Sequence, residues 1–410
     1  MFHAPSLLRQ CHRQLGLHIP EAYTSTYSCM WRLFKKHFLA YNGQRRLLHF
    51  TGTAGKYKSP TKTLVSSVLG ELREMDPNVK SLYEGLLEGN RASLAKAITL
   101  VESVHPTHRE QAQVLLTKIL HHQRKQQKHA LKDSTFRIGL TGPPGAGKST
   151  FIESFGKFLT DQGHHVAVLA VDPSSSTTGG SLLGDKTRMP ELSRDEKAYI
   201  RPSPACGSLG GVTRTTNEAV VLCEGGGYNM ILIETVGVGQ SEFVVADMVD
   251  LFCLIIPPAG GDELQAIKKG IIEVADIVVI NKSDGDLVPA ARRIKAEYTS
   301  ALKFMRRRYK DWRPQVCRVS SITKEGLPDV YTKMNSFKDT MVKSGEFATK
   351  RQKQLKVWMW NHLQQDVMNR FRSSPYVQQK LPELEELVMR GVITPGFAAD
   401  LLLKAFDKQS

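Results

Sequence analysis

Gly142-Pro-Pro-Gly-Ala-Gly-Lys-Ser-Thr150 is the stretch that decides the fold of this chain. It fits the spacing G-x-x-x-x-G-K-[ST], in which a glycine-rich turn leads directly into a helix. Glycines let the backbone turn so tightly that successive N–H groups point inward at phosphate oxygens. The lysine adds a cation for the β- and γ-phosphates, and the serine hydroxyl is a ligand for Mg²⁺. The residues expected around the phosphates of a nucleotide are Gly142, Pro143, Pro144, Gly145, Ala146, Gly147, Lys148, Ser149 and Thr150.

The residues on either side of this loop support the same interpretation. Residues 136–141 form an apolar run that predicts a strand before the loop. After the loop, apolar residues recur at helical spacing at Phe151, Ile152, Phe155 and Leu159. A turn rich in glycine and proline can match the motif by chance, but a preceding strand and a following helix are the context that the motif requires.

Beyond the loop, short β-branched runs alternate with helical patterns along the chain. Such alternation is typical of an α/β fold, with a mostly parallel sheet covered by helices on both faces. Ligands of these sheets bind beyond the carboxyl ends of the strands, so polar residues that end the runs should converge on the phosphate loop. The expected strands are 136–140, 166–171, 229–234, 250–256, 276–280 and 315–319, with a further candidate at 197–201.

Two of these runs end in a carboxylate. Asp172 follows the run 166–171, and Glu234 closes the run 229–234. A carboxylate at a strand tip beside a phosphate loop can hold Mg²⁺ directly or through its water, and the amide of Gly237 can contact the γ-phosphate. Because aspartate is also a common helix N-cap, a purely structural role stays open for Asp172.

The base is indicated by Asn281-Lys-Ser-Asp284, which fits N-K-x-D at the end of an apolar run. Asp284 can accept hydrogen bonds from guanine N1–H and the N2 amino group, which adenine does not offer. Lys282 would lie along the ring, and Asn281 would tie this segment to the phosphate loop. GTP is therefore favoured over ATP. Backbone amides from residue 319 onward could meet guanine O6, and the expected contacts are Ser320, Ser321 and Ile322.

The loop after Glu234 predicts slow intrinsic hydrolysis. Gly237 is followed by Val238, whose side chain cannot hydrogen-bond the attacking water, whereas many GTPases use a glutamine for this purpose. The nearest polar replacements are Gln240 and Glu242. We expect Gln240 to act in hydrolysis when a partner or a second subunit presses its loop toward the γ-phosphate.

Charge is distributed unevenly along the 410 residues, whose formal net charge is +16. Residues 1–62 carry ten Lys and Arg against one acid, Glu21, a composition that predicts a mitochondrial transit peptide and hence a matrix protein. A basic tail for RNA or lipid is the alternative. The rest of the chain is only mildly basic and has no apolar run of about 18 residues, so we expect neither a nucleic-acid partner nor a membrane span.

Helical patterns occupy both ends of the remaining chain. Asn90 is a candidate N-cap, followed by apolar residues at helical spacing over 94–101 and again over 112–119. Residues 351–371 predict a long helix, with one or two more helices at 382–406. This C-terminal arm could cover the domain's own core or meet a second subunit. The expected divisions are a leader at 1–62, a helical module at 63–132, a nucleotide-binding domain at 133–343 and a helical arm at 344–410.

Two other classes of protein use related phosphate loops. A metallochaperone GTPase shares the sheet and loops but needs soft or imidazole ligands, and the cysteines after residue 62 show no CxxC or other metal-ligand spacing. A small-molecule kinase would more often bind adenine, which the N-K-x-D segment does not favour. The metallochaperone remains the alternative.

Several long strings of the sequence resemble the MeaB family of GTPases. Such strings are much more specific than a phosphate loop alone, and the likeness runs from about residue 70 to the C-terminus. Besides the phosphate loop, they are Val171-Asp-Pro-Ser-Ser175, Gly179-Gly-Ser-Leu-Leu-Gly-Asp-Lys-Thr-Arg-Met189, Gly210-Gly-Val-Thr-Arg-Thr-Thr216, Glu234-Thr-Val-Gly-Val-Gly-Gln-Ser-Glu242 and Pro257-Pro-Ala-Gly-Gly-Asp-Glu263.

The resemblance implies a G-protein chaperone of methylmalonyl-CoA mutase. In that family, GTP binding and hydrolysis gate the transfer of adenosylcobalamin from its adenosyltransferase to the mutase, and the removal of damaged cofactor. No Asp-x-His-x-x-Gly string offers an axial histidine in this sequence, so cobalamin should be held by the partners and not bound directly. Family members are homodimers joined through a C-terminal arm, which favours a second subunit as the contact of residues 344–410.

The resemblance also implies roles for individual residues. Residues 177–189 and 235–245 would be mobile switches, and 257–268 a third switch that faces the mutase. Glu234 stands where ordinary G proteins have an aspartate, so its carboxylate reaches one methylene further. The implied Mg²⁺ and hydrolysis shell is Ser149, Asp172, Asp185 and Glu234. The full catalytic set expected, with Gln240 added, is Lys148, Asp185, Glu234 and Gln240.

Overall fold

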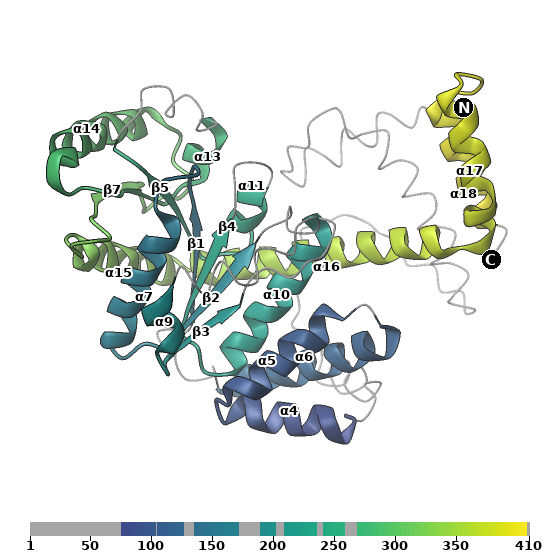
Figure 1. Cartoon of the computed structure of the whole chain (residues 1–410), viewed down its shortest axis with the longest axis horizontal. Helices are drawn as coiled ribbons and strands as arrows, with labels where there is room; N and C mark the ends of the chain where they lie inside the picture. The colour runs from purple at the N-terminus through teal and green to yellow at the C-terminus, as the bar shows by residue number, and fades with distance from the viewer. Residues whose placement is uncertain are drawn as a thin grey trace, which may run out of the picture. The chain divides into compact units, whose positions relative to one another are not determined.

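Seven parallel strands form a single sheet in the computed structural model, which describes residues 75–103, 105–126, 135–171, 189–201, 209–235, 241–258 and 269–407. The strand order is β3-β2-β4-β1-β5-β6-β7 (Figure 1). The predicted α/β fold is confirmed, and the further candidate strand is the edge strand β3. The strands are β1 (Phe136–Thr141), β2 (Val166–Val171), β3 (Ala198–Arg201), β4 (Met230–Thr235), β5 (Leu251–Ile256), β6 (Ile277–Ile280) and β7 (Gln315–Arg318).

Helices cover both faces of this sheet. One face carries α7 (Lys148–Asp161), α9 (Pro190–Arg194) and α15 (Leu327–Lys343). The other carries α10 (Leu209–Gly225), α11 (Ser241–Ala246), α13 (Lys269–Val274) and α14 (Val288–Phe304). Successive side chains of a strand point to opposite faces, so Ile231 is buried in the core beside α10 while Leu232 is buried in the core beside α7.

The helix after the phosphate loop is held in place by its apolar face. Phe151, Ile152, Phe155 and Leu159 are all fully buried, as their spacing predicts. Burying side chains of this size stabilises the fold by about 1.5–3 kcal/mol each. The start of α7 is therefore fixed against the carboxyl end of β1.

A helical module precedes the sheet and packs on α10. Asn90 caps the second of its helices, accepting hydrogen bonds from the backbone N–H groups of Ala92 at 2.9 Å and Ser93 at 3.1 Å. Apolar side chains of the module share one core with α10. Contact is so close that a Cβ added at Gly225 would lie 2.6 Å from Ile119. The module helices are α4 (Pro77–Leu87), α5 (Arg91–Glu102) and α6 (Pro106–Gln126).

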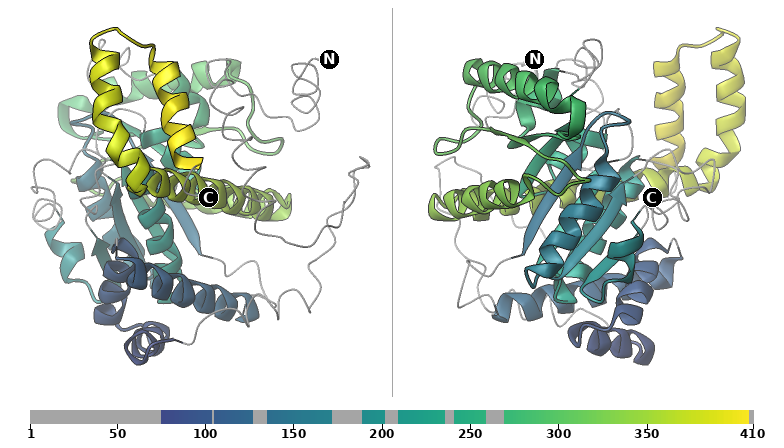
Figure 2. Two further views of the ribbon diagram at one scale, coloured as in Figure 1. Left: turned by 90° about the vertical axis from the view of Figure 1, so that its right-hand side faces the viewer. Right: turned by 60° about the vertical axis from the view of Figure 1, so that its left-hand side comes forward.

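Three helices form the C-terminal arm. They are α16 (Glu346–Ser373), α17 (Pro375–Met389) and α18 (Pro395–Asp407), of which the last two lie side by side (Figure 2). The helix expected to begin at 382 begins earlier, at Pro375. Proline is favoured at the first position of a helix, where the backbone N–H that it lacks would have no partner within the helix. Pro382 lies inside that helix.

Two polar clusters hold α16 against the rest of the chain. At the amino ends of the strands, Arg351 of α16 contacts Asp250 at 2.6 Å, and Arg137 of β1 contacts Glu224 at 2.7 Å. Trp358 of α16 lies with its ring 5.5 Å from the guanidinium of Arg137. The carboxylates of Asp250 and Glu224 are almost fully buried, so each needs a positively charged partner. Arg351 and Arg137 are those partners.

The second cluster joins α16 to α10 and α6. Asp366 of α16 pairs with Arg109 of α6, and lies 3.4 Å from Arg214 of α10. One turn earlier on α16, His362 lies 4.0 Å from Glu218 of α10. Arg214 belongs to the segment 210–216, one of those that resemble the MeaB family. This segment lies in α10 and contacts the C-terminal arm through Arg214.

The helix expected over 287–308 ends at Phe304. The chain leaves the helix so that Tyr309 can insert against Phe337, with ring centroids 5.9 Å apart. Arg308 donates a hydrogen bond to the carbonyl of Val274 at 2.9 Å and fixes the turn. Within the described ranges, no helix is both long and apolar enough to span a membrane. The leader and residues 63–74 lie outside those ranges.

Candidate functional site

The phosphate loop joins the end of β1 to the start of α7. Gly145 and Gly147 have left-handed backbone, with φ of 79° and 81°. A Cβ at Gly142 would lie 2.0 Å from the carbonyl oxygen of Ile255, and no neighbouring side chain could move to relieve such a contact with backbone. Glycine is therefore required at position 142 by the close approach of another backbone segment. At positions 145 and 147 it is required by the backbone conformation, as the motif predicts.

Lys148 begins α7 and folds back over the loop. Its Nζ donates hydrogen bonds to the carbonyl oxygens of Gly142 at 2.9 Å and Pro143 at 3.3 Å. The N-terminus of α7 adds a partial positive charge at the same place. The loop thus gathers a cation and a helix N-terminus, an arrangement that suits the phosphates of a nucleotide.

Ser149 and Glu234 meet where β1 and β4 end. The Ser149 hydroxyl donates to Glu234 Oε1 at 3.3 Å, and Glu234 is only 4% exposed. The strand tips are tied together by Thr235, whose hydroxyl donates to that of Thr141 at 2.9 Å. Two hard oxygen donors beside a phosphate loop fit Mg²⁺. When bound there, the ion would neutralise charge on the β- and γ-phosphates.

The N-K-x-D segment follows β6 and contacts the phosphate loop. Asn281 Nδ2 donates to the carbonyl oxygens of Ala146 at 3.0 Å and Gly147 at 3.2 Å, which is the connection predicted from the sequence. Its Oδ1 accepts a hydrogen bond from the hydroxyl of Ser321 at 2.7 Å. Ser154 of α7 in turn donates to the carbonyl of Ser321 at 2.6 Å. The N-K-x-D segment, the segment at Ser321 and the phosphate loop with its helix therefore form one hydrogen-bonded unit.

Sequence reasoning missed Ser154. It is 8% exposed and lies on the otherwise apolar face of α7. The sequence does contain a signal for it, since Ser154 is a single hydroxyl on an apolar face of the helix. A buried hydroxyl needs a hydrogen-bond partner, so this position predicts a polar contact.

Asp284 carries the observation that matters most for base choice. Its Oδ1 is buried and accepts no hydrogen bond from any described residue. Leaving a buried carboxylate oxygen unpaired costs about 1–3 kcal/mol or more. The N1–H and N2 amino group of guanine are donors of the kind this oxygen lacks. Lys282 next to it has φ of 55° and an exposed side chain, so its stem is available to lie along a ring.

The O6 side of the base site differs from expectation. The amide of Val319 already donates to Ile280 O at 2.8 Å, and that of Ser320 to Glu325 O at 3.0 Å, because the segment continues the sheet and then turns. The prediction of a contact with guanine O6 is therefore limited to the amides of Ser321 and Ile322. The Ile322 side chain is 75% exposed and leaves this position open.

The predicted residues of the switches lie mostly outside the part of the chain that the structure describes. Asp172, Asp185, Gly237 and Gln240 lie outside the described residues, as does most of the expected third switch. In the described part of the chain, no group of three or more His, Cys, Asp or Glu side chains is arranged to hold a metal ion. Cys223, Cys253 and Cys317 are buried free thiols, and burial raises the pKa of each.

Comparison with known families agrees with this geometry. The family described as "Methylmalonyl Co-A mutase-associated GTPase MeaB" matches residues 94–376. This chain belongs to the MeaB family of GTPases. The match covers the module after Leu94, the whole sheet with the phosphate loop and N-K-x-D segment, and α16.

Individual relatives are similar to this MeaB GTPase over most of its length. The mouse protein named "Methylmalonic aciduria type A homolog, mitochondrial" is 64% identical over 332 residues, which are 81% of this chain and 80% of the relative. A "Putative GTPase" of Caulobacter vibrioides is 47% identical over 80% of this chain and 98% of its own length. A crystal structure titled "LAO/AO transport system kinase" matches 81% of this chain and 99% of its own, with 35% identity and a TM-score of 0.61. The fold and the family support GTP hydrolysis as the activity of this MeaB GTPase.

Proposed function

We propose that the chain is a GTP-dependent chaperone of methylmalonyl-CoA mutase. It gates the loading of adenosylcobalamin onto the mutase and the release of damaged cofactor, with the cobalamin adenosyltransferase as its second partner. The family description names the mutase, and the mouse relative's name refers to methylmalonic aciduria. The observation that carries the nucleotide assignment is the buried, unpaired Oδ1 of Asp284.

The residues divide the work of binding and hydrolysis. The loop over 142–150 holds the phosphates, and Lys148 offsets their charge. Ser149 and Glu234 hold Mg²⁺ with Asp172 and Asp185, and the ion supplies charge stabilisation for phosphoryl transfer. Gly237 donates its amide to the γ-phosphate. No residue in this set binds cobalamin, which stays with the partners.

The surface of α16 supports a homodimer formed through the arm. Met359, Trp360 and Met368 are 57%, 43% and 48% exposed, although they are large apolar side chains. Trp358, on the same helix, is buried against the chain's own core. A second subunit that covers the exposed side would remove these side chains from water, which favours association.

Binding of the mutase tests the proposal directly. The chain should be retained by immobilised mutase to different extents with GDP and with a non-hydrolysable GTP analogue, because a gate must distinguish the two nucleotides. Lys148→Ala, which loses the phosphate cation, should abolish the difference. Equal retention with both nucleotides, or none with either, would remove the chaperone function and leave the GTPase.

Gln240 is predicted to act only in the stimulated reaction. The mutase should raise the rate of phosphate release, and Gln240→Ala should remove more of the stimulated rate than of the basal one. A partner-supplied contribution can reach about 10³–10⁵ in rate when an arginine is inserted, and less without one. Val238→Ala is the matched control, because it changes a nearby residue whose side chain cannot hydrogen-bond water. Full stimulation of Gln240→Ala would show that another residue orients the water.

The leader predicts import into mitochondria and cleavage before Leu64, and we propose the matrix as the final compartment. The curated relatives from mouse and Caenorhabditis elegans are named mitochondrial. A fluorescent reporter fused to residues 1–65 should localise to mitochondria. The same fusion with Arg9, Arg13 and Arg32 changed to glutamate is the control, since import requires the positive charge. A diffuse cytosolic signal from the unaltered fusion would favour a basic tail instead.

A further inference from the structure

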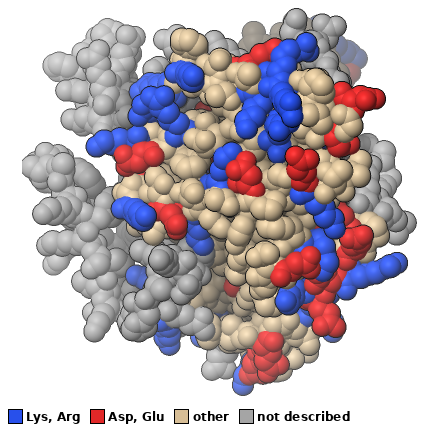
Figure 3. Space-filling view, turned by 90° about the vertical axis from the view of Figure 1, so that its left-hand side faces the viewer, with Lys and Arg blue, Asp and Glu red and all other residues tan. Residues whose placement is uncertain are grey.

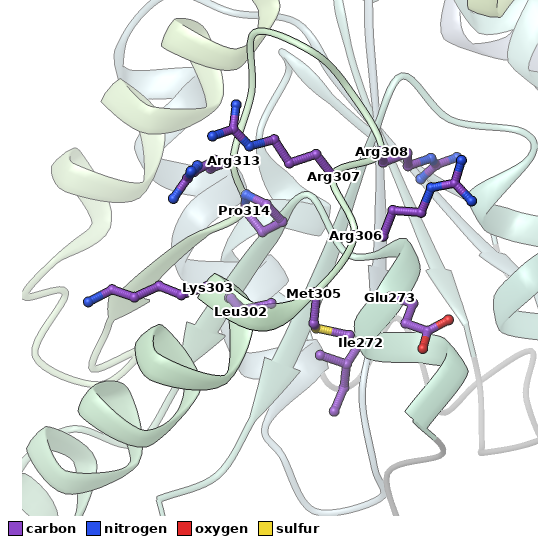
Figure 4. A pocket seen from close by; sticks show the side chains of 10 residues that line it. All are labelled: Ile272, Glu273, Leu302, Lys303, Met305, Arg306, Arg307, Arg308, Arg313 and Pro314. Atoms are coloured by element: carbon purple, nitrogen blue, oxygen red, sulfur yellow. The ribbon is translucent and has the colours of Figure 1, made fainter.

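A second surface lies at the opposite end of the sheet from the nucleotide site. The nucleotide segments follow the carboxyl ends of β1, β4 and β6, whereas residues 305–314 precede the amino end of β7. There the ends of α13 and α14 and this connecting segment enclose a hollow of about 40 Å³ (Figure 4). We call it the basic hollow, after the side chains at its rim, Lys303, Arg306, Arg307, Arg308 and Arg313.

The rim is strongly and locally positive. Residues 303–313 hold six basic side chains and one acid, Asp311, a formal charge of +5 in eleven residues, and the lining of the hollow adds one further acid, Glu273 of α13. Figure 3 shows groups of lysines and arginines in the upper part of this side of the molecule, with acidic residues beside them. In the described part of the chain, neither Arg306 nor Arg313 forms an ion pair with a carboxylate. These cations are therefore free to meet an anionic partner.

The side chain of Arg308, unlike those of Arg306 and Arg313, is held by contacts within the described part of the chain. Besides its hydrogen bond to Val274 O, its Nη1 lies 3.9 Å from buried Asp276, and its guanidinium is 5.4 Å from the ring of Tyr309. It fixes the segment that carries the other arginines. The backbone of this segment is therefore fixed in place. Arg306 and Arg307 extend from it into solvent.

The hollow also has an apolar component. Ile272, Leu302, Met305 and Pro314 contribute to its walls. Phe304, which lies between the lining residues Lys303 and Met305 in the sequence but does not line the hollow itself, is 90% exposed. Exposed aromatic side chains next to arginines are the composition that protein–protein interfaces favour.

We propose that the basic hollow docks an acidic segment of a partner protein. A carboxylate-rich segment pairs with Arg306, Arg307 and Arg313, and a short apolar side chain enters the hollow against its apolar walls. A volume near 40 Å³ holds only a few waters, so one side chain fits but a nucleotide or a coenzyme does not. The concave shape favours a protein segment over a flat lipid surface.

Docking at this place has a direct link to the switch region. α13 begins at Lys269, immediately after the expected third switch, and its end is held by Arg308 through Val274 O. A partner bound at the basic hollow therefore contacts the element that leads out of that switch. The inference rests on the proposed function for its partner, the mutase.

Charge reversal at the rim tests the inference. Arg306→Glu/Arg307→Glu changes two exposed residues that make no buried contact, so the variant should fold. Its association rate with mutase at low salt should fall roughly 10- to 100-fold, because rim charges mainly act on the rate of encounter. The deficit should shrink at high salt, where exposed charges are screened. Met305→Ala, which changes an apolar wall of the hollow, should instead speed dissociation.

A matched control comes from the same helix. Arg292→Glu/Arg293→Glu makes the same charge change at exposed positions of α14 outside the rim, and should change the association rate less than about threefold. Association and dissociation would be measured with the full chain, loaded with GDP and with a non-hydrolysable GTP analogue. Basal GTP hydrolysis should be equal in all variants, because none of these residues is in the nucleotide site.

The outcomes separate the inference from the proposed function. Intact mutase binding with an unchanged association rate for Arg306→Glu/Arg307→Glu overturns the inference alone, and so does an equal loss in both charge-reversed variants. No mutase binding by the unaltered chain overturns the chaperone function and the inference together. Phosphatidylserine vesicles give one more arm, since rim-dependent binding to vesicles with unchanged mutase binding would assign the rim to a membrane.

Discussion

Replacing Asp284 with asparagine is expected to weaken GTP binding by roughly 100-fold or more and to improve the binding of xanthosine triphosphate. In the unaltered chain, the buried Oδ1 of Asp284 has no donor among the described residues. Guanine supplies two donors to this carboxylate, and the amide of asparagine would place a donor against them. Xanthine has an oxygen where guanine has its amino group, so it can accept from that amide.

Titration of both nucleotides into both proteins measures this change. Asp286→Asn is the matched control, because it removes the same charge from an exposed residue two positions away. The control should keep its GTP affinity. If Asp284→Asn also keeps it, guanine is bound by other groups and the N-K-x-D interpretation fails.

Replacing Arg351 with methionine is expected to cost about 3–5 kcal/mol of unfolding free energy, the usual penalty for removing one partner of a buried ion pair. Arg351 contacts Asp250 at 2.6 Å, and it lies 3.7 Å from Glu224. Its Nη2 also donates to the carbonyl of Thr135 at 2.7 Å. Methionine fills much of the space but leaves two buried carboxylates short of a cation.

The pH dependence of stability provides a second measurement of the same network. Burial alone would raise the pKa of Asp250, but the charge and hydrogen bonds of Arg351 outweigh it and hold that pKa below its usual range. A lowered folded-state pKa means that the stabilisation is complete above the unfolded pKa of about 3.9 and is lost as pH falls through the folded value. Arg351→Met should therefore flatten the loss of stability below about pH 4.

Chemical unfolding at several pH values distinguishes this effect from a general one. Arg370→Met, on an exposed stretch of the same helix, should change stability by less than about 0.5 kcal/mol. A similar small change for Arg351→Met would mean that α16 is held by its apolar contacts alone.

The phosphate loop and the strands could be predicted because their signals are local. Glycine spacing, apolar runs and the N-K-x-D segment each lie within a few residues, and the tie from Asn281 to the loop follows from the sheet that joins them. The Arg351 network could not be predicted in this way. Its members are 101 residues apart in the Arg351–Asp250 pair and 87 in the Arg137–Glu224 pair, and charged residues usually predict an exposed face.

Sequence reasoning was less accurate at helix ends. The segment after Ser374 contains two prolines, which suggest a break, yet Pro375 starts α17 and Pro382 lies within it. Proline is tolerated in the first turn, so the start is explained by local rules. Pro382 is exposed, and no local pattern indicates that the helix continues through it.

The two attachments of α16 make the arm a lever. The helix is continuous over 28 residues, or about 42 Å, with one attachment at Arg351 near its start and another at Asp366 nearer its end. The far end lies about 33 Å from the first attachment, so a tilt of about 5° there would displace it by about 3 Å. Because the second attachment includes Arg214 of α10, a small rotation of α10 would produce a larger movement of α17 and α18. The ratio of the two displacements is set by the position of Asp366 along the helix.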